Sequence, residues 1–202
     1  MKKTLTFLLC LGTLISLFTL SSSAAKTHTV VRGDSLWKIA VKYEVGLSEI
    51  KSANPNIKNY DLIYPGDIIN IPENDDSAKS FEREVVRLVN VERTKRGLPP
   101  LSENWQLSRV ARYKSQDMKD KGYFSHTSPT YGSPFQMMKS FGISYRTAGE
   151  NIAKGQSTPR AVVNAWMNSS GHRANILNSS FTEIGVGYVS GGNYWTQMFI
   201  GK

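Results

Sequence analysis

The apolar residues of this chain fall into three successive patterns, of which the first is one unbroken run. Lys2-Lys3 precedes an apolar stretch from Leu5 to Leu20, and the small residues Ser23-Ala24-Ala25 follow it. A basic start, a short apolar run and a small-x-small ending are typical of a secretory signal peptide. A membrane-spanning helix needs about 20 apolar residues, so an uncleaved anchor is the weaker alternative. We predict that residues 1–25 are a signal peptide.

The second pattern, over residues 28–72, predicts a strand, two helices and a strand. Extended segments are expected at His28–Val31, with His28 exposed, and at Ile68–Pro72. Asp34 is the expected cap of the first helix and Ser48 that of the second. The apolar stripe of the first helix recurs at i, i+3, i+4 and i+7, namely Leu36, Ile39, Ala40 and Tyr43.

The third pattern begins after a polar segment that starts at Pro72, which predicts a linker over residues 73–79 and a second domain over residues 80–202. Three amphipathic helices and a terminal β-hairpin are expected in this domain, which makes the fold class α+β. The helical stripes are Phe81, Val85, Leu88 and Val89, then Leu107, Val110, Ala111 and Met118, then Ala161, Val162, Ala165 and Trp166. The hairpin strands are residues 183–189 and 194–200. Trp105, Trp166, Trp195 and Phe199 are expected in the core.

The composition of the chain limits which cellular compartment and which binding partners are expected. The 202 residues carry a net charge of +9, and removal of Lys2-Lys3 with the signal peptide leaves 9 − 2 = +7. The only cysteine, Cys10, lies in the signal peptide, so no disulfide is expected. A basic exported protein suits an anionic cell wall. Export and the lack of a clustered Lys/Arg face argue against nucleic acid as a partner, and no stable membrane span is expected after cleavage.

Residues 28–72 resemble a LysM module, a small βααβ fold, from end to end. The matching residues are Thr29-Val30-x-x-Gly33-Asp34-Ser35-Leu36-Trp37-x-Ile39-Ala40, Asn54-Pro55 and Tyr64-Pro65-Gly66-Asp67-x-Ile69-x-Ile71-Pro72. The resemblance implies binding of peptidoglycan or another N-acetylglucosamine polymer in a shallow groove between two loops. Carried over by position, the groove residues are Gly33, Asp34, Ser35 and Leu36 on one side and Asn54, Pro55, Asn56 and Ile57 on the other. The alternative for each residue alone is that it only shapes a turn.

Residues 80–202 resemble the bacterial, SCP-like branch of the CAP superfamily. The superfamily takes its name from cysteine-rich secretory proteins, antigen 5 and pathogenesis-related 1. The motifs are Val89-Asn90-x-x-Arg93-x-x-x-Gly97-Leu98-x-x-Leu101, Phe124-Ser125-His126, Gly149-Glu150-Asn151-Ile152, Trp166-x-x-Ser169-x-Gly171-His172-Arg173-x-Asn175-Ile176-Leu177, Ile184-Gly185-Val186-Gly187 and Trp195-Thr196-Gln197-x-Phe199. The resemblance implies a three-layer α-β-α sandwich with a central cleft.

By this resemblance, the cleft would hold His126, Glu150 and His172, while the family's second acid is missing at Trp166-Met167-Asn168-Ser169. Two imidazoles and one carboxylate would suit a zinc-like divalent ion with an open position for water. The same groups would suit acid–base catalysis. A purely structural hydrogen-bonded network is the third interpretation. The sequence identifies neither a nucleophile nor an oxyanion site.

The sequence thus predicts a secreted protein that LysM retains on the cell wall, in a vegetative wall or a spore envelope, of a Gram-positive source. The CAP domain is expected to bind a lipid, a protein or another ligand. The alternative is a wall hydrolase or peptidase that uses His126, Glu150 and His172 as its catalytic residues. No enzyme activity is assigned, because a family name narrows the fold more than the chemistry.

Overall fold

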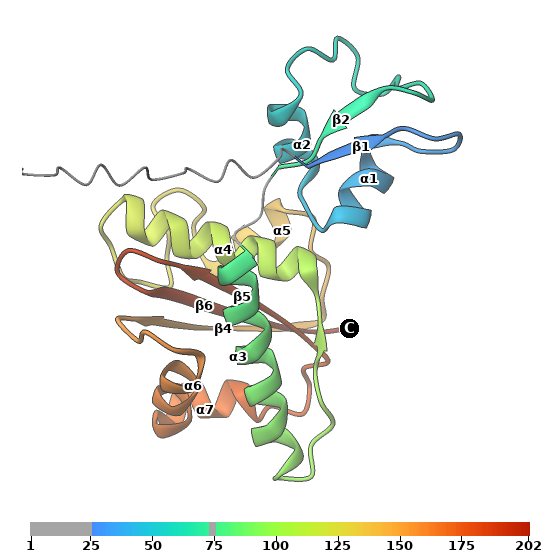
Figure 1. Ribbon diagram of the computed structural model, residues 1–202. Coiled ribbons are helices and arrows are strands. Elements are labelled where there is room, and N and C mark those ends of the chain that lie inside the picture. Colours follow the sequence, from blue (N-terminus) through green and yellow to red (C-terminus); the bar gives the residue numbers. More distant parts are fainter. Residues whose placement is uncertain (1–25, 73–75) are drawn as a thin grey trace, which may run out of the picture.

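The computed structural model describes residues 26–72 and 76–202, which form a small N-terminal module and a larger C-terminal domain (Figure 1). The predicted signal peptide, residues 1–25, lies outside the described residues. Within the described part of the chain, no helix is both long and apolar enough to cross a membrane.

The N-terminal module has the predicted order of strand, helix, helix and strand. Its elements are β1 (Thr27–Thr29), α1 (Leu36–Tyr43), α2 (Leu47–Ala53) and β2 (Ile68–Asn70). The two strands pair antiparallel, with His28 opposite Ile69. Leu36, Ile39 and Ala40 of the predicted stripe are buried against Ile50 and Ile69, so the two helices and the short sheet share one core.

Three local expectations in this module are wrong. Ser35, not Asp34, caps α1, because its hydroxyl accepts a hydrogen bond from the Lys38 amide. Gly46 stands at the N-cap of α2 and supplies no side-chain cap, and Ser48 lies inside that helix. His28 is buried rather than exposed, because its ring pairs with the Tyr43 hydroxyl and the Asp34 carboxylate.

The C-terminal domain is a four-stranded sheet between helices. Its strand order is β3-β5-β6-β4, with β3 parallel to β5 and the other pairs antiparallel. Its elements are α3 (Asp76–Thr94), β3 (Ser102–Glu103), α4 (Trp105–Asp120), α5 (Pro134–Ser140), β4 (Thr147–Lys154), α6 (Pro159–Asn168), α7 (Ser170–Ile176), β5 (Glu183–Val189) and β6 (Tyr194–Gly201).

Helices cover both faces of this sheet, which confirms the predicted α-β-α sandwich (Figure 1). Trp195 and Phe199 of β6 pack with residues of α3, α6 and α7 in one core. Met198 and Ile200 of the same strand pack with residues of α4 and α5 in the other. The strand alternation of β6 therefore supplies side chains to both cores.

Glycines bring α4 unusually close to the sheet. A Cβ atom added at Gly187 would lie 2.1 Å from the backbone nitrogen of Arg112, and one at Gly185 would lie 2.3 Å from that of Ser108. Only residues without a side chain fit under the helix backbone at this distance. The Gly185-Val186-Gly187 motif thus sets the packing distance between α4 and β5.

Some boundaries and burials in this domain differ from expectation. Helix α3 begins at Asp76, inside the predicted linker of residues 73–79. The buried side of α6 carries Pro159, Val162, Val163 and Trp166, which recur at i, i+3, i+4 and i+7, and Ala161 and Ala165 fall outside this stripe and are exposed. Trp105 is only partly buried and is not a core residue, because it opens α4 at the edge of the domain.

The two modules contact each other through charged side chains. The Arg109 guanidinium of α4 donates hydrogen bonds of 2.5 and 2.8 Å to the Glu49 carboxylate of α2, and one of 2.9 Å to the Ser48 hydroxyl. The Tyr113 hydroxyl donates to the same carboxylate at 2.7 Å. These bonds hold the N-terminal module against α4.

Candidate functional site

A cavity of about 200 Å³ opens in the N-terminal module beside the predicted glycan-binding residues. Asp34, Ser35 and Leu36 of the first loop line it, and Gly33 is not among its lining residues. The opposite wall is formed by Tyr60, Asp61 and Ile63 rather than by residues 54–57. The second wall therefore lies further along the loop between α2 and β2 than its sequence motif.

Asn54 holds that loop in place. Its side-chain amide donates 2.8 Å hydrogen bonds to the Ile50 and Asn70 carbonyls, and its side-chain oxygen accepts one from the Asn70 amide. Asn54 is buried, Ile57 packs against the module core, and Pro55 and Asn56 are exposed beyond the cavity wall. Asn54 therefore joins α2 to β2.

Asp34 orders the first loop. Its carboxylate lies 2.9 Å from the His28 Nε2 atom and accepts a 2.9 Å hydrogen bond from the Val31 amide. These hydrogen bonds, first that of His28, lower the pKa of Asp34. Gly33 has a φ of +92°, where a side chain would be strained, and its carbonyl accepts from the Lys38 ammonium. Both residues thus shape the rim of the cavity.

The second candidate site lies in the C-terminal domain around β4. His126 follows α4 in a loop, and its Nδ1 atom lies 2.7 Å from the Glu150 carboxylate of β4. The His126 side chain is 52% exposed, whereas that of Glu150 is 1% exposed. Burial raises the pKa of Glu150, although the His126 hydrogen bond and the Lys114 charge oppose this effect. The pair therefore joins a solvent-facing imidazole to a buried carboxylate.

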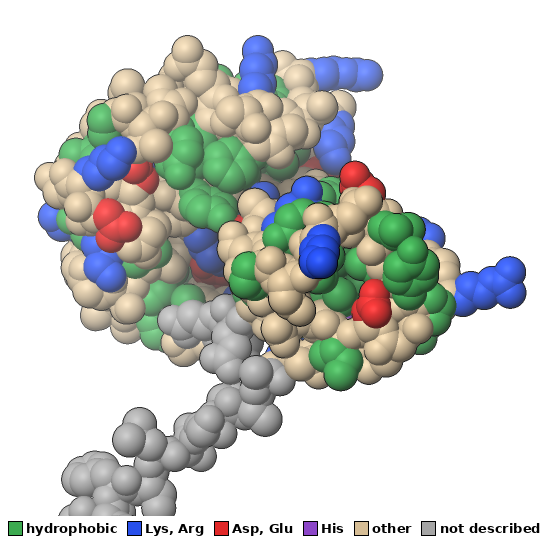
Figure 2. Space-filling model, turned by 90° about the horizontal axis from the view of Figure 1, so that it is seen from above, with side chains coloured by type: hydrophobic (Ala, Val, Ile, Leu, Met, Phe, Trp, Pro, Cys, Tyr) green, Lys and Arg blue, Asp and Glu red, His purple; other side chains and the backbone are tan. Residues whose placement is uncertain are grey.

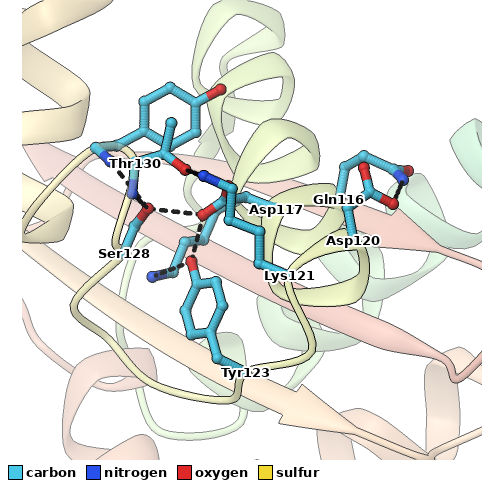
Figure 3. Close-up of polar contacts among 9 residues, drawn as sticks. Gln116, Asp117, Asp120, Lys121, Tyr123, Ser128 and Thr130 are labelled. Carbon is cyan, nitrogen blue, oxygen red and sulfur yellow. Dashed lines mark hydrogen bonds and ion pairs between the residues drawn. The ribbon is translucent and has the colours of Figure 1, made fainter.

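A hydrogen-bonded network fixes the loop that carries His126 (Figure 3). Asp117 of α4 accepts hydrogen bonds from the hydroxyl groups of Tyr123, Ser128 and Thr130. The buried Lys114 of the same helix donates to the His126 carbonyl at 2.8 Å. Neither residue was predicted from the sequence; both lie on the buried side of α4. The signal that the sequence did offer for them is their place among apolar residues on the buried side of a helix.

His172 lies on α7, close enough to His126 for their charges to interact. Burial, and then the charge of His126, lower its pKa, which favours a neutral imidazole. The Asn151 side chain donates to the His172 carbonyl and to the Gln197 side chain. Asn175 of α7 donates to the Glu150 carbonyl. These amides tie α7 to β4.

The site has one unsatisfied carboxylate oxygen. Glu150 Oε2 is buried and has no hydrogen-bond partner within the described residues. No three His, Cys, Asp or Glu side chains among residues 26–72 and 76–202 are grouped so that they could hold a metal ion. His126 and Glu150 are in contact, whereas His172 is not grouped with them as a third ligand. Acid–base chemistry by the His126–Glu150 pair is geometrically feasible.

Comparison with known families identifies both parts of the chain. The profile of the LysM domain matches residues 28–72, and that of the "Cysteine-rich secretory protein family", CAP, matches residues 86–200. The LysM domain implies peptidoglycan binding and association with the cell wall.

Curated relatives resemble different parts of the chain. "Uncharacterized protein YkwD" of Bacillus subtilis is 69% identical over 126 residues, which are 62% of this chain and 49% of the relative. "Uncharacterized membrane protein YlbC" of the same organism is 37% identical over 168 residues, 79% of this chain and 48% of the relative. The chain thus spans about half the length of these relatives. "Spore coat assembly protein ExsA" of Bacillus cereus is 49% identical over 47 residues, 23% of this chain and 7% of the relative.

Solved structures agree with these matches. An extracellular protein from Bacillus anthracis that contains an SCP domain is 37% identical, with a TM-score of 0.60 over 68% of this chain and 47% of that chain. An outer surface protein of Borrelia burgdorferi, 21% identical, has a TM-score of 0.57 over 65% of this chain and 96% of that one, and it supports the fold alone. The chain therefore belongs to the cysteine-rich secretory protein (CAP) family and carries a LysM domain in front of its CAP domain.

Proposed function

We propose that this is a secreted protein that LysM retains on the peptidoglycan of a Gram-positive cell wall, where its CAP domain binds a further ligand or partner. The cavity between the two LysM loops carries the proposal. Asp34 and Ser35 supply polar groups at one wall, and Tyr60 and Asp61 stand at the other. A modest apolar surface with a few polar groups suits an N-acetylated sugar.

The His126–Glu150 pair supports a binding role for the CAP domain. Glu150 keeps a buried oxygen without a partner among the described residues, and a ligand donor would satisfy it once the His126 ring moves aside. His126 is half exposed and within reach of such a ligand. A lipid head group and a protein segment both offer hydrogen-bond donors. The class of this ligand is left to a binding screen.

Co-sedimentation with purified peptidoglycan tests the wall-binding proposal. Trp37 lines the LysM cavity and is 50% exposed, so Trp37→Ala removes contact area while leaving the module core intact. We expect wild type to sediment with peptidoglycan and Trp37→Ala to remain largely in solution. Phe135→Ala, which removes a similarly exposed aromatic ring from α5, is the matched control. Equal sedimentation of wild type and Trp37→Ala would contradict the assignment of the groove.

A wall hydrolase or peptidase is the second candidate function. The observation in its favour is the 2.7 Å contact between His126 and Glu150, because a carboxylate that orients an imidazole can make it a general base. Release of soluble fragments from peptidoglycan by wild type, and not by His126→Ala, would establish this activity.

Two finer expectations remain proposals. A zinc-like ion at His126, Glu150 and His172 is tested by calorimetric titration of the protein with zinc, in which saturable binding lost in His126→Ala would support it. A place in the spore envelope is the alternative to the vegetative wall, and it is suggested by the similarity of 47 residues to a spore coat assembly protein. Fractionation of growing cells and spores separates the two locations.

A further inference from the structure

A second cavity adjoins the LysM groove and is shared by both domains. It has a volume of about 370 Å³, and Trp37 and Leu47 line both it and the groove. Its remaining walls include Trp105 and Gln106 from the start of α4 and Phe141 from the end of α5. The two cavities therefore meet at Trp37 and Leu47, and the second one reaches the surface of the CAP domain.

The chemistry of this surface suits an uncharged sugar. Trp37 is 50% exposed, and Trp105 and Phe141 are partly buried, so all three rings offer apolar area to a ligand. Gln106 adds an amide that can donate and accept hydrogen bonds. The nearby Glu49 carboxylate is already paired with Arg109. Aromatic rings with a few polar groups are a usual lining for a ligand that has one apolar face.

The contact between the modules keeps the two cavities aligned. Arg109 lines the second cavity and holds Glu49 at 2.5 and 2.8 Å. Gly46, at the start of α2, lies directly against this pair, since an added Cβ would be 2.2 Å from Arg109 Nε. In the space-filling view of Figure 2, the smaller module is seated against the larger one, with hydrophobic side chains beside the junction.

We propose that the LysM groove extends onto the CAP domain, where Trp105 and Phe141 form a further sugar-binding surface. The two domains then hold one N-acetylglucosamine-containing strand. This inference rests on the proposed glycan binding, and it adds residues of the CAP domain to the proposed binding site. The inference predicts that longer N-acetylglucosamine oligomers bind more tightly than short ones, because they also contact residues outside the LysM domain.

Calorimetric titration of the whole protein with the linear trimer and hexamer of N-acetylglucosamine tests the extension. We expect Trp105→Ala to weaken hexamer binding about fivefold, as loss of one aromatic contact does, and to leave trimer binding unchanged. Gly46→Ala, which displaces the Arg109–Glu49 pair, should have the same selective effect. Phe135→Ala is the matched control and should bind both oligomers as wild type does.

The outcomes separate the extension from the function on which it rests. An unchanged hexamer affinity in Trp105→Ala, with trimer binding intact, would overturn the extension and leave LysM binding in place. An equal loss for trimer and hexamer would place Trp105 in the primary groove and also overturn it. Failure of wild type to bind either oligomer would contradict the proposed glycan binding itself.

Discussion

Glu49 of the LysM domain and Arg109 of the CAP domain form an ion pair through two hydrogen bonds, of 2.5 and 2.8 Å. Tyr113 donates a third hydrogen bond to the same carboxylate, at 2.7 Å. Burial raises the pKa of Glu49, but the hydrogen bonds of Arg109, Ser48 and Tyr113 outweigh it and lower the pKa to about 2. The contact between the domains is therefore sensitive to acid.

Acidification is expected to separate the two domains before it unfolds them. The pKa of Glu49 in the contact is lower than its usual value of 4.5, so the stabilisation is complete above about pH 4.5 and is lost as the pH falls towards 2. The radius of gyration from small-angle scattering should rise over this range while helical circular dichroism persists. Glu49→Gln should show the larger radius at neutral pH. A constant radius for both proteins would contradict the prediction.

Gly187→Ala is expected to destabilise the CAP domain strongly. The new Cβ would lie 2.1 Å from the Arg112 backbone nitrogen, so α4 must move away from β5. Overpacking of this kind costs about 2–3 kcal/mol. Denaturant unfolding measures it, with Gly171→Ala as the control, because nothing lies within 4 Å of a Cβ at Gly171 in α7. Equal stabilities of the two variants would show that the close approach is not required.

Asp117→Ala should loosen the loop that carries His126. The substitution leaves the hydroxyl groups of Tyr123, Ser128 and Thr130 without their acceptor, at a cost of about 1–3 kcal/mol. Hydrogen exchange in residues 121–132 should become faster. Asp120→Ala removes an exposed carboxylate that pairs only locally with Gln116, and it should change little (Figure 3). Unchanged exchange in Asp117→Ala would exclude this role of the network.

The regular elements were predictable where one periodicity dominated. The α3 residues Val85 and Val89 recur at helical spacing, and the β5–β6 hairpin has two runs of strand-forming residues around Gly191-Gly192. Strand β4 was not predicted, because Thr147–Lys154 is buried at both faces and includes the polar residues Glu150 and Asn151. The hydrogen-bond partners that Glu150 and Asn151 do have, His126 and Gln197, are distant in sequence, and no local pattern reveals them.

The candidate site was predictable only in part, and the prediction came from family motifs rather than from periodicity. His126, Glu150 and His172 came from motif resemblance, and the structure brings His126 and Glu150 into contact. The burial of His28 depends on Tyr43 and Asp34, which approach it only after folding. The Glu49–Arg109 pair joins residues of two domains, and neither domain's pattern contains a signal for it. Contacts of this kind follow from tertiary structure alone.

His172 should titrate at a lower pH than an exposed histidine. Burial, followed by the charge of His126, lowers its pKa from the ordinary value of 6.5. His126→Asn removes the second cause, so the pKa of His172 should rise but remain below 6.5. Titration of the imidazole signals by nuclear magnetic resonance measures both values. A pKa of His172 at or above 6.5 in the wild type would contradict the placement of this ring.

The central proposal is that the protein binds the wall and does not cut it. The most direct test incubates wild type and His126→Ala/His172→Ala with labelled peptidoglycan, and measures sedimented protein and released label in the same samples. The account predicts that both proteins sediment equally and release no label above the protein-free control. Release of label by wild type that is absent in the double variant, with sedimentation unchanged, would contradict the account and establish a wall hydrolase.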